Sequence, residues 1–199
     1  AVVKSVPNKS TVTKIVIPDE YEGVPVTKIA DFSATNLEYV TEFYIGKNIK
    51  EIGTWALENN QHITAYEVDE SNEYFCDVDG VIYSKDMKTL LFYPAAKDLT
   101  IAKDSEGKDI KVSQYTIPDG VEIIRSKAFY KCNALTKVEI PATVTRIEEK
   151  AFFRCEKLEE ITLQSALEFI GKDAFSYCYG LKEINIPASV KQIDEYAFY

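Results

Sequence analysis

A pattern of 23 residues is repeated four times, without insertion or deletion, over residues 117–199. Its apolar columns are Val121, Val144, Leu167 and Val190, then Ile124, Ile147, Ile170 and Ile193, then the pairs Ala128-Phe129, Ala151-Phe152, Ala174-Phe175 and Ala197-Phe198. A unit of this size is too small to bury its own apolar side. The pattern therefore predicts a solenoid, in which each turn is buried against its neighbours.

The same pattern extends into the N-terminal half of the chain, so that it covers residues 12–68 and 112–199. One earlier copy has the column residues Ile45, Ile49, Ile52, Ala56, Asn60 and Ile63, and the copy before it has Val26, Ile29, Ser33, Leu37 and Val40. Five residues, Asp19 to Gly23, are inserted in that earliest copy. We expect residues 1–199 to form a single domain, a solenoid of seven or eight turns.

Residues 69–111 do not follow the columns. Val81–Tyr83 and Leu90–Tyr93 are β-rich runs on either side of a polar segment, which predicts a hairpin that ends at Pro94. A second polar segment, 103–109, has the composition of a turn. We interpret both as hairpins inserted into modified solenoid turns. A break between two short solenoids is the alternative.

The local chemistry of one repeat predicts the path of its chain. Apolar and polar residues alternate from Val138 to Ile140, as in a strand, and Pro141 lacks the amide that would continue the ladder. Residues 144–147 suit a second short strand, and Glu148–Phe152 suit a helical turn. We expect parallel strands near residues 12–17, 41–45, 64–68, 112–117, 136–140, 159–163 and 182–186.

The segment from Leu135 to Cys155 reads Leu-x-x-Val-x-Ile-Pro-x-x-Val-x-x-Ile-x-x-x-Ala-Phe-x-x-Cys, and it resembles the BspA-like leucine-rich repeat of bacterial surface and secreted proteins. The segment from 79–83 through 91–94 resembles a hairpin variant found between such repeats. The resemblance implies a right-handed superhelix with a parallel β-sheet on its concave face. It implies short strands and helical turns on the convex face, with a β-hairpin insertion in the middle. It also implies adhesion and protein recognition, and no enzyme activity.

Composition narrows the function further. The chain is 46% hydrophobic and 28% charged, which suits an ordered core, and its formal net charge of −9 argues against nucleic-acid binding. It contains no apolar run of about 18 residues, so we expect no membrane insertion. The chain begins at Ala1 without an initiator Met, and its last copy stops at Tyr199 before the cysteine column. We expect a fragment of a longer extracellular or cell-surface protein whose signal peptide has been removed.

Three cysteines, Cys132, Cys155 and Cys178, occupy one column and are expected to stack on successive turns. The column is otherwise apolar, which favours reduced, buried packing residues over a disulfide between neighbours. Zinc is less favoured still, because the spacing contains no C-x-x-C pair and only His62 could assist. Cys76 lies in the irregular segment and is expected to be more exposed.

Catalytic and cofactor motifs are absent from the sequence, and we expect no cofactor. Asp77, Asp79 and Gly80, with Asp69 and Glu70 upstream, could form a Ca²⁺ loop, but their spacing departs from D-x-[DN]-x-[DN]-G. Paired glutamates elsewhere are typical of a solvated surface. The sequence therefore contains no convincing catalytic or metal site.

The outward positions of the parallel strands are the remaining candidate surface. They form a polar, mildly acidic face, and its candidate partner-binding residues are Glu42, Tyr44, Glu67, Glu139, Glu160 and Glu183. Aromatic residues in loops, namely Tyr83, Phe92, Tyr93, Tyr177 and Tyr179, compete as binding elements. We expect a non-catalytic recognition module for a protein, or a glycan, on a host or neighbouring cell. The alternative is a structural spacer that holds another domain away from the cell.

Overall fold

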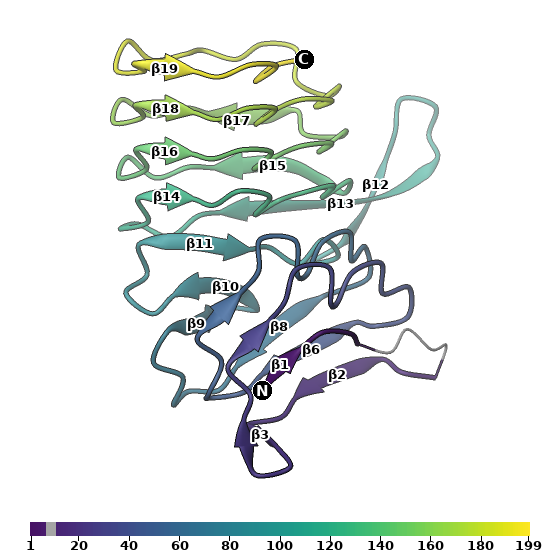
Figure 1. The fold of residues 1–199 in the computed structure, drawn as a ribbon. Coiled ribbons are helices and arrows are strands. Elements are labelled where there is room, and N and C mark those ends of the chain that lie inside the picture. Colours follow the sequence, from purple (N-terminus) through teal and green to yellow (C-terminus); the bar gives the residue numbers. More distant parts are fainter. Residues whose placement is uncertain (7–10) are drawn as a thin grey trace.

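The computed structural model describes residues 1–6 and 11–199, and the chain is a β-solenoid of about eight turns. No residue in these two ranges is helical. The C-terminal turns stack directly on one another, whereas the N-terminal strands run at an angle to them (Figure 1). The solenoid is therefore bent near its middle.

The longer strands of the repeats form two parallel ladders, one in each half. In sequence order they are β2 (Lys14–Ile17), β6 (Glu42–Ile45) and β8 (Ala65–Val68) in the first ladder, and β13 (Asp109–Thr116), β15 (Leu135–Glu139) and β17 (Glu160–Thr162) in the second. Six of the expected strands are thus confirmed to within a few residues. The strand expected at 182–186 is wrong. Those residues have a neighbouring turn on one side only, and Ile186 is 44% exposed there.

Shorter strands line a second face. The N-terminal set is β1 (Val2–Val3), β5 (Lys28–Ile29) and β7 (Glu51–Ile52), and the C-terminal set is β14 (Ile123–Ile124), β16 (Arg146–Ile147), β18 (Phe169–Ile170) and β19 (Gln192–Ile193). Both sets are parallel. The insertion in the earliest copy forms a small antiparallel pair, β3 (Glu20–Tyr21) with β4 (Val24–Pro25).

The helical turn expected at 148–152 is wrong. The chain forms a series of tight turns there, in which the amide of Ala151 donates to the carbonyl of Glu148. Lys150 and Arg154 have φ of 57° and 58°, in the left-handed region. A right-handed helix cannot pass through such residues, so the acidic start of this segment does not lead into a helix.

The expected hairpin of the middle segment is confirmed. β10 (Val81–Ser84) pairs antiparallel with β11 (Thr89–Phe92) and with β9 (Phe75–Val78), and β11 then runs parallel to β14. We call the turns of residues 112–199 the C-terminal stack, and those of residues 1–6 and 11–68 the N-terminal stack. The hairpin thus takes the place of a short strand at the start of the C-terminal stack. Figure 1 shows it between the two halves.

Two hydrophobic cores meet at this hairpin. The C-terminal core contains Val81, Tyr83 and Leu90, while the N-terminal core contains Ile82, Leu91 and Phe92. Each hairpin strand therefore contributes to both cores. The two long-strand ladders are not hydrogen-bonded to each other, so the parallel stacking is interrupted once, within residues 69–111.

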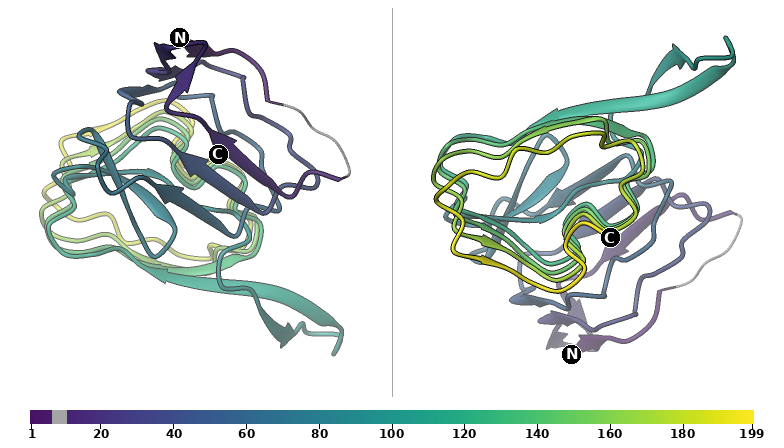
Figure 2. Two further views of the ribbon diagram at one scale, coloured as in Figure 1. Left: turned by 90° about the horizontal axis from the view of Figure 1, so that it is seen from below. Right: turned by 90° about the horizontal axis from the view of Figure 1, so that it is seen from above.

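The second polar segment also forms a hairpin, as expected. β12 (Thr100–Lys103) pairs antiparallel with the first half of β13, and the resulting two-stranded ribbon projects from the solenoid (Figure 2). Only residues 113–116 of β13 pair with β15, so the outer part of the ribbon has no strand beside it apart from its own partner.

Candidate functional site

The exposed face of the first long-strand ladder carries a shared ion pair. The ammonium of Lys14 lies 3.2 Å from Glu42 and 3.3 Å from Glu67, and these contacts raise the pKa of Lys14. Beside them the hydroxyl of Tyr44 donates to Asp69 at 2.6 Å, which raises the pKa of Tyr44 to about 12 and lowers the pKa of Asp69. Three of the predicted site residues are thus brought together.

The second ladder repeats this arrangement. Lys137 lies 3.3 Å from Glu139 and 3.5 Å from Glu160, and the hydroxyl of Thr116 donates to Glu139 at 3.0 Å. The Thr116 hydrogen bond and the Lys137 charge lower the pKa of Glu139, while Glu139 and Glu160 raise that of Lys137. Each ladder therefore presents one lysine between two glutamates, which leaves one negative charge in excess.

A groove of about 400 Å³ lies over the second ladder. Polar side chains on its wall belong to Thr116, Asp119, Lys137, Glu139, Glu160, Thr162 and Gln164. The parallel backbone beneath them fixes their spacing, because successive strands are hydrogen-bonded in register. The predicted residue Glu183 is exposed but lies beyond β17, outside both this groove and the ladder.

The aromatic residues of the first hairpin are not binding elements. Tyr83, Phe92 and Tyr93 are each 4% exposed or less, because the hairpin lies between the two cores. The expectation that they compete for a partner is therefore wrong. Tyr177 is half-buried and Tyr179 is 66% exposed, so these two remain accessible.

Of a second row of aromatic residues, only Tyr177 was singled out from the sequence. Tyr130, Phe153, Tyr177 and Tyr199 follow one another along the outside of the turns, with ring centroids 5.3 to 5.5 Å apart. They lie just after the Ala-Phe column, whose own phenylalanines stack inside the core. The aromatic residues adjacent to that column were the available signal.

The thiols and the acidic residues of the middle segment have protein partners. Cys155 and Cys178 are buried, and each thiol donates to a carbonyl of the preceding turn at 3.1 Å. Asp77 accepts from the amide of Val68, and Asp79 pairs with Lys97 at 2.7 Å. Within residues 1–6 and 11–199, no three histidine, cysteine or acidic side chains gather as a metal site would require.

The repeat pattern matches the family described as BspA type leucine rich repeat region, with six copies over residues 5–78 and 101–199. The chain belongs to the BspA-type leucine-rich repeat family. A comparison with curated protein sequences found no match. Within residues 1–6 and 11–199, the structure contains no helix that is long and apolar enough to cross a membrane.

Two solved structures of bacterial proteins have folds similar to that of this BspA-type chain. The pneumococcal vaccine antigen PcpA is 30% identical, with a TM-score of 0.73, over 86% of this chain and 39% of PcpA. A leucine-rich cell surface protein of Faecalibacterium prausnitzii is 25% identical, with a TM-score of 0.70, over 95% of this chain and 51% of that protein. This chain thus spans about two fifths of the length of the first protein and about half of the second.

Proposed function

We propose that this chain is a non-catalytic recognition module of a cell-surface or secreted bacterial protein, and that it binds a protein partner through the long-strand face. Membership of the BspA-type family supports this proposal. The similarity to a protein described as a leucine-rich cell surface protein supports the location. The proposed site comprises Glu42, Tyr44 and Glu67 on the first ladder, and Glu139 and Glu160 on the second, with Glu183 beyond it.

The groove over the second ladder is the observation that carries the proposal. The polar side chains on its wall stand on a backbone that a parallel ladder holds in register, so little backbone ordering is needed when a partner binds. The excess negative charge around Lys137 favours a basic partner, whose approach it accelerates. Salt screens such steering, with a Debye length of about 8 Å at physiological ionic strength.

Charge reversal on the groove tests the proposal. Proteins from host or neighbouring-cell surfaces are captured on the immobilised domain, and each is then measured by surface plasmon resonance against the variants. We expect the double variant Glu139→Lys/Glu160→Lys to lower the association rate at least tenfold. The matched control, Glu73→Lys/Glu106→Lys, changes the net charge equally at exposed positions away from the ladders and is expected to bind normally.

The association rate of the wild-type domain is also expected to fall as salt is raised. Unchanged binding by the double variant, whose folding is checked by circular dichroism, would remove the groove from the proposal. Adding Glu183→Lys to the double variant tests the last predicted residue. Because Glu183 lies off the ladder, we expect this addition to have little further effect.

A structural spacer is the second candidate function. This function is favoured by the length of the two solved bacterial proteins described above, of which this chain spans only 39% and 51%. A spacer requires a stiff stack but no partner on the long-strand face. The two functions are distinguished by deleting the domain from the protein that carries it or by replacing it with an unrelated rod of equal length. Retention of adhesion with the rod would favour the spacer.

A further inference from the structure

An outer row of side chains lies on the turns that follow the Ala-Phe column in the C-terminal stack. We define the outer row as Tyr130, Lys131, Phe153, Arg154, Tyr177 and Tyr199. The rings of Tyr130 and Phe153 stack at 5.3 Å, and those of Phe153 and Tyr177 meet edge to face at the same distance. The cations lie over these rings, with Lys131 5.3 Å from the ring of Tyr130 and Arg154 5.1 Å from that of Tyr177.

The backbone beneath the outer row has the same left-handed conformation in both halves of the solenoid. In the N-terminal stack the equivalent positions are Asn36 and Asn59, with φ of 55° and 59°. Asparagine adopts the left-handed region more readily than most other residues. In the C-terminal stack Lys131, Arg154 and Tyr177 adopt the same conformation, with φ of 56°, 58° and 61°. Cations and an aromatic residue therefore stand where asparagine would be less strained, so the turn conformation itself does not require them.

The two cations of the outer row lack an acidic partner. Neither Lys131 nor Arg154 forms an ion pair in the part of the chain that the structure describes, and Arg154 is exposed. Their neighbours differ, because Lys150 pairs with Glu149 and Asp173 at 3.0 and 3.4 Å. Glu58, which is half-buried next to Tyr130, interacts electrostatically with Lys131 without forming an ion pair with it. Unpaired cations are unexpected on a chain of net charge −9.

Ring geometry indicates the chemistry of a partner. The rings of Tyr130 and Phe153 are nearly parallel, at 7°, so they cover one face of each other, and Arg154 lies against the ring of Tyr177. Sugars stack on exposed ring faces, and a neighbouring ring or cation covers a face of Tyr130, Phe153 and Tyr177, whereas Tyr199 at the end of the row is 69% exposed. The positive ring edges, the tyrosine hydroxyls and the two cations favour carboxylates.

We propose that the outer row binds an acidic, extended segment of a partner protein. Two successive turns repeat the same group of a ring and a cation, and Tyr177 and Tyr199 continue the row of rings, so a segment lying along the stack meets them in succession. Tyrosine and arginine are also the residues that contribute most to protein interfaces. This site is separate from the groove over the second ladder and has the opposite charge preference.

The test uses fluorescein-labelled decaglutamate as the probe and fluorescence anisotropy as the measurement. The test variant is Lys131→Asn/Arg154→Asn, which introduces the residue found at these positions in the N-terminal stack. We expect it to bind at least tenfold more weakly. We also expect its thermal midpoint to be equal or higher, because asparagine suits the left-handed turn. The matched control, Lys103→Gln/Lys108→Gln on the projecting ribbon, loses the same charge and is expected to bind as the wild type does.

Other results would overturn the proposal. It fails if decaglutamate does not bind the wild-type domain, if the Asn variant binds normally, or if the ribbon control loses as much affinity as the Asn variant. Tighter binding of polygalacturonate than of decaglutamate through the same two residues would assign the row to an acidic polysaccharide instead. The groove variant Glu139→Lys/Glu160→Lys should retain decaglutamate binding, so this inference and the proposed function can fail independently.

Discussion

At the scale of single residues, the cysteine column has a defined hydrogen-bonding role. Cys155 donates to the carbonyl of Phe129, and in the N-terminal stack Asn60 donates from its amide to the equivalent carbonyl, that of Ala34, at 2.8 Å. At Asn60, Cys155 and Cys178 the column therefore holds a side chain that donates to a buried carbonyl of the preceding turn, whereas Leu37 fills the same column with an apolar side chain. This explains how a polar asparagine fits a column that is otherwise apolar, because buried polar groups are tolerated when they are hydrogen-bonded.

The buried thiols predict a loss of stability in alkali. Burial raises the pKa of Cys132 and Cys155, and it raises that of Cys178 from an ordinary 9.0 to about 12. The folded state then keeps protons that the unfolded state releases. Stability is complete below about pH 8.5 and falls as pH rises toward 12, by about 1.4 kcal/mol per pH unit for each thiol. We expect Cys155→Ala to reduce this slope by about that amount in urea titrations between pH 9.5 and 11. Equal slopes would show that Cys155 does not titrate as a buried thiol.

Thiol reactivity gives a second prediction at this scale. Cys132, Cys155 and Cys178 are at most 8% exposed, whereas Cys76 is half-buried. Labelling of the native protein with Ellman's reagent should therefore modify at most Cys76, because protonated and enclosed thiols do not react. All four should react after denaturation. Rapid modification of more than one thiol in the native protein would contradict this burial.

At the scale of the repeated element, a phenylalanine stack runs along the C-terminal core. The rings of Phe129 and Phe152 are 4.7 Å apart, those of Phe152 and Phe175 are 5.2 Å apart, and those of Phe175 and Phe198 are 5.4 Å apart. All are nearly parallel, at 10° or less. Each turn thus contributes one ring, and a ring such as that of Phe152 is buried because the turns on both sides cover it.

Position in the stack should decide the effect of a truncation. Phe152 is fully buried between two rings, so Phe152→Ala is expected to cost about 3–5 kcal/mol of unfolding free energy. Phe198 is 39% exposed and stacks on one ring, so Phe198→Ala should cost much less. Urea denaturation followed by circular dichroism measures both. Equal losses at the two positions would mean that stability does not depend on stacking between turns.

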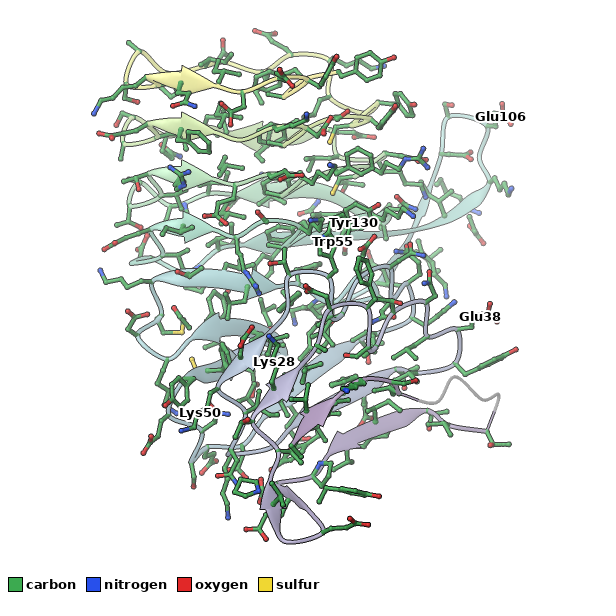
Figure 3. The ribbon with its side chains drawn as sticks, in the orientation of Figure 1. Lys28, Glu38, Lys50, Trp55, Glu106 and Tyr130 are labelled. Carbon is green, nitrogen blue, oxygen red and sulfur yellow. The ribbon has the colours of Figure 1, made fainter. Side chains whose placement is uncertain are left out.

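At the scale of the whole molecule, the bend is held by contacts between the two stacks. The guanidinium of Arg125 donates to the carbonyl of Ile52 at 3.0 Å and to the hydroxyl of Thr54 at 3.1 Å. The ammonium of Lys127 lies 3.2 Å from the ring centroid of Trp55. Figure 3 shows Trp55 and Tyr130 at the level where the stacks meet, and Glu106 at the tip of the ribbon.

Trp55 is the only tryptophan and therefore reports on this junction. Because the hairpin belongs to both cores, we expect the fluorescence of Trp55 and the circular dichroism to change together in urea. Arg125→Met should lower the unfolding free energy by about 1.5–3 kcal/mol, the usual worth of hydrogen bonds to a charged group. It should also move the Trp55 transition to lower urea than the dichroism midpoint. Coincident transitions in this variant would show that the hairpin alone couples the stacks.

The period, the register and most of the strands could be predicted from the sequence, because each depends on alternation and spacing within one repeat. The same reasoning placed Glu139 and Glu160 on one face, because Glu160 is in register with Lys137, and Glu139 lies two residues after Lys137 on the same strand. The bend was not predictable, because it depends on how the non-repeating segment packs between two cores. For the same reason Tyr83 is buried, although its sequence context suggested an exposed loop.

The turns and the outer row also depended on tertiary contacts. An acidic segment before an Ala-Phe pair is compatible with a helical turn, but bonds between successive turns hold Lys150 and Arg154 in left-handed conformations instead. Alternate amides in these turns have their acceptor in the next repeat, as when Lys150 donates to Lys172 and Arg154 to Ser176, whereas the amides between them donate within the same turn. The local preference for a helical turn is overridden here because a backbone amide that is buried between turns must be hydrogen-bonded, and the neighbouring turn supplies the acceptor.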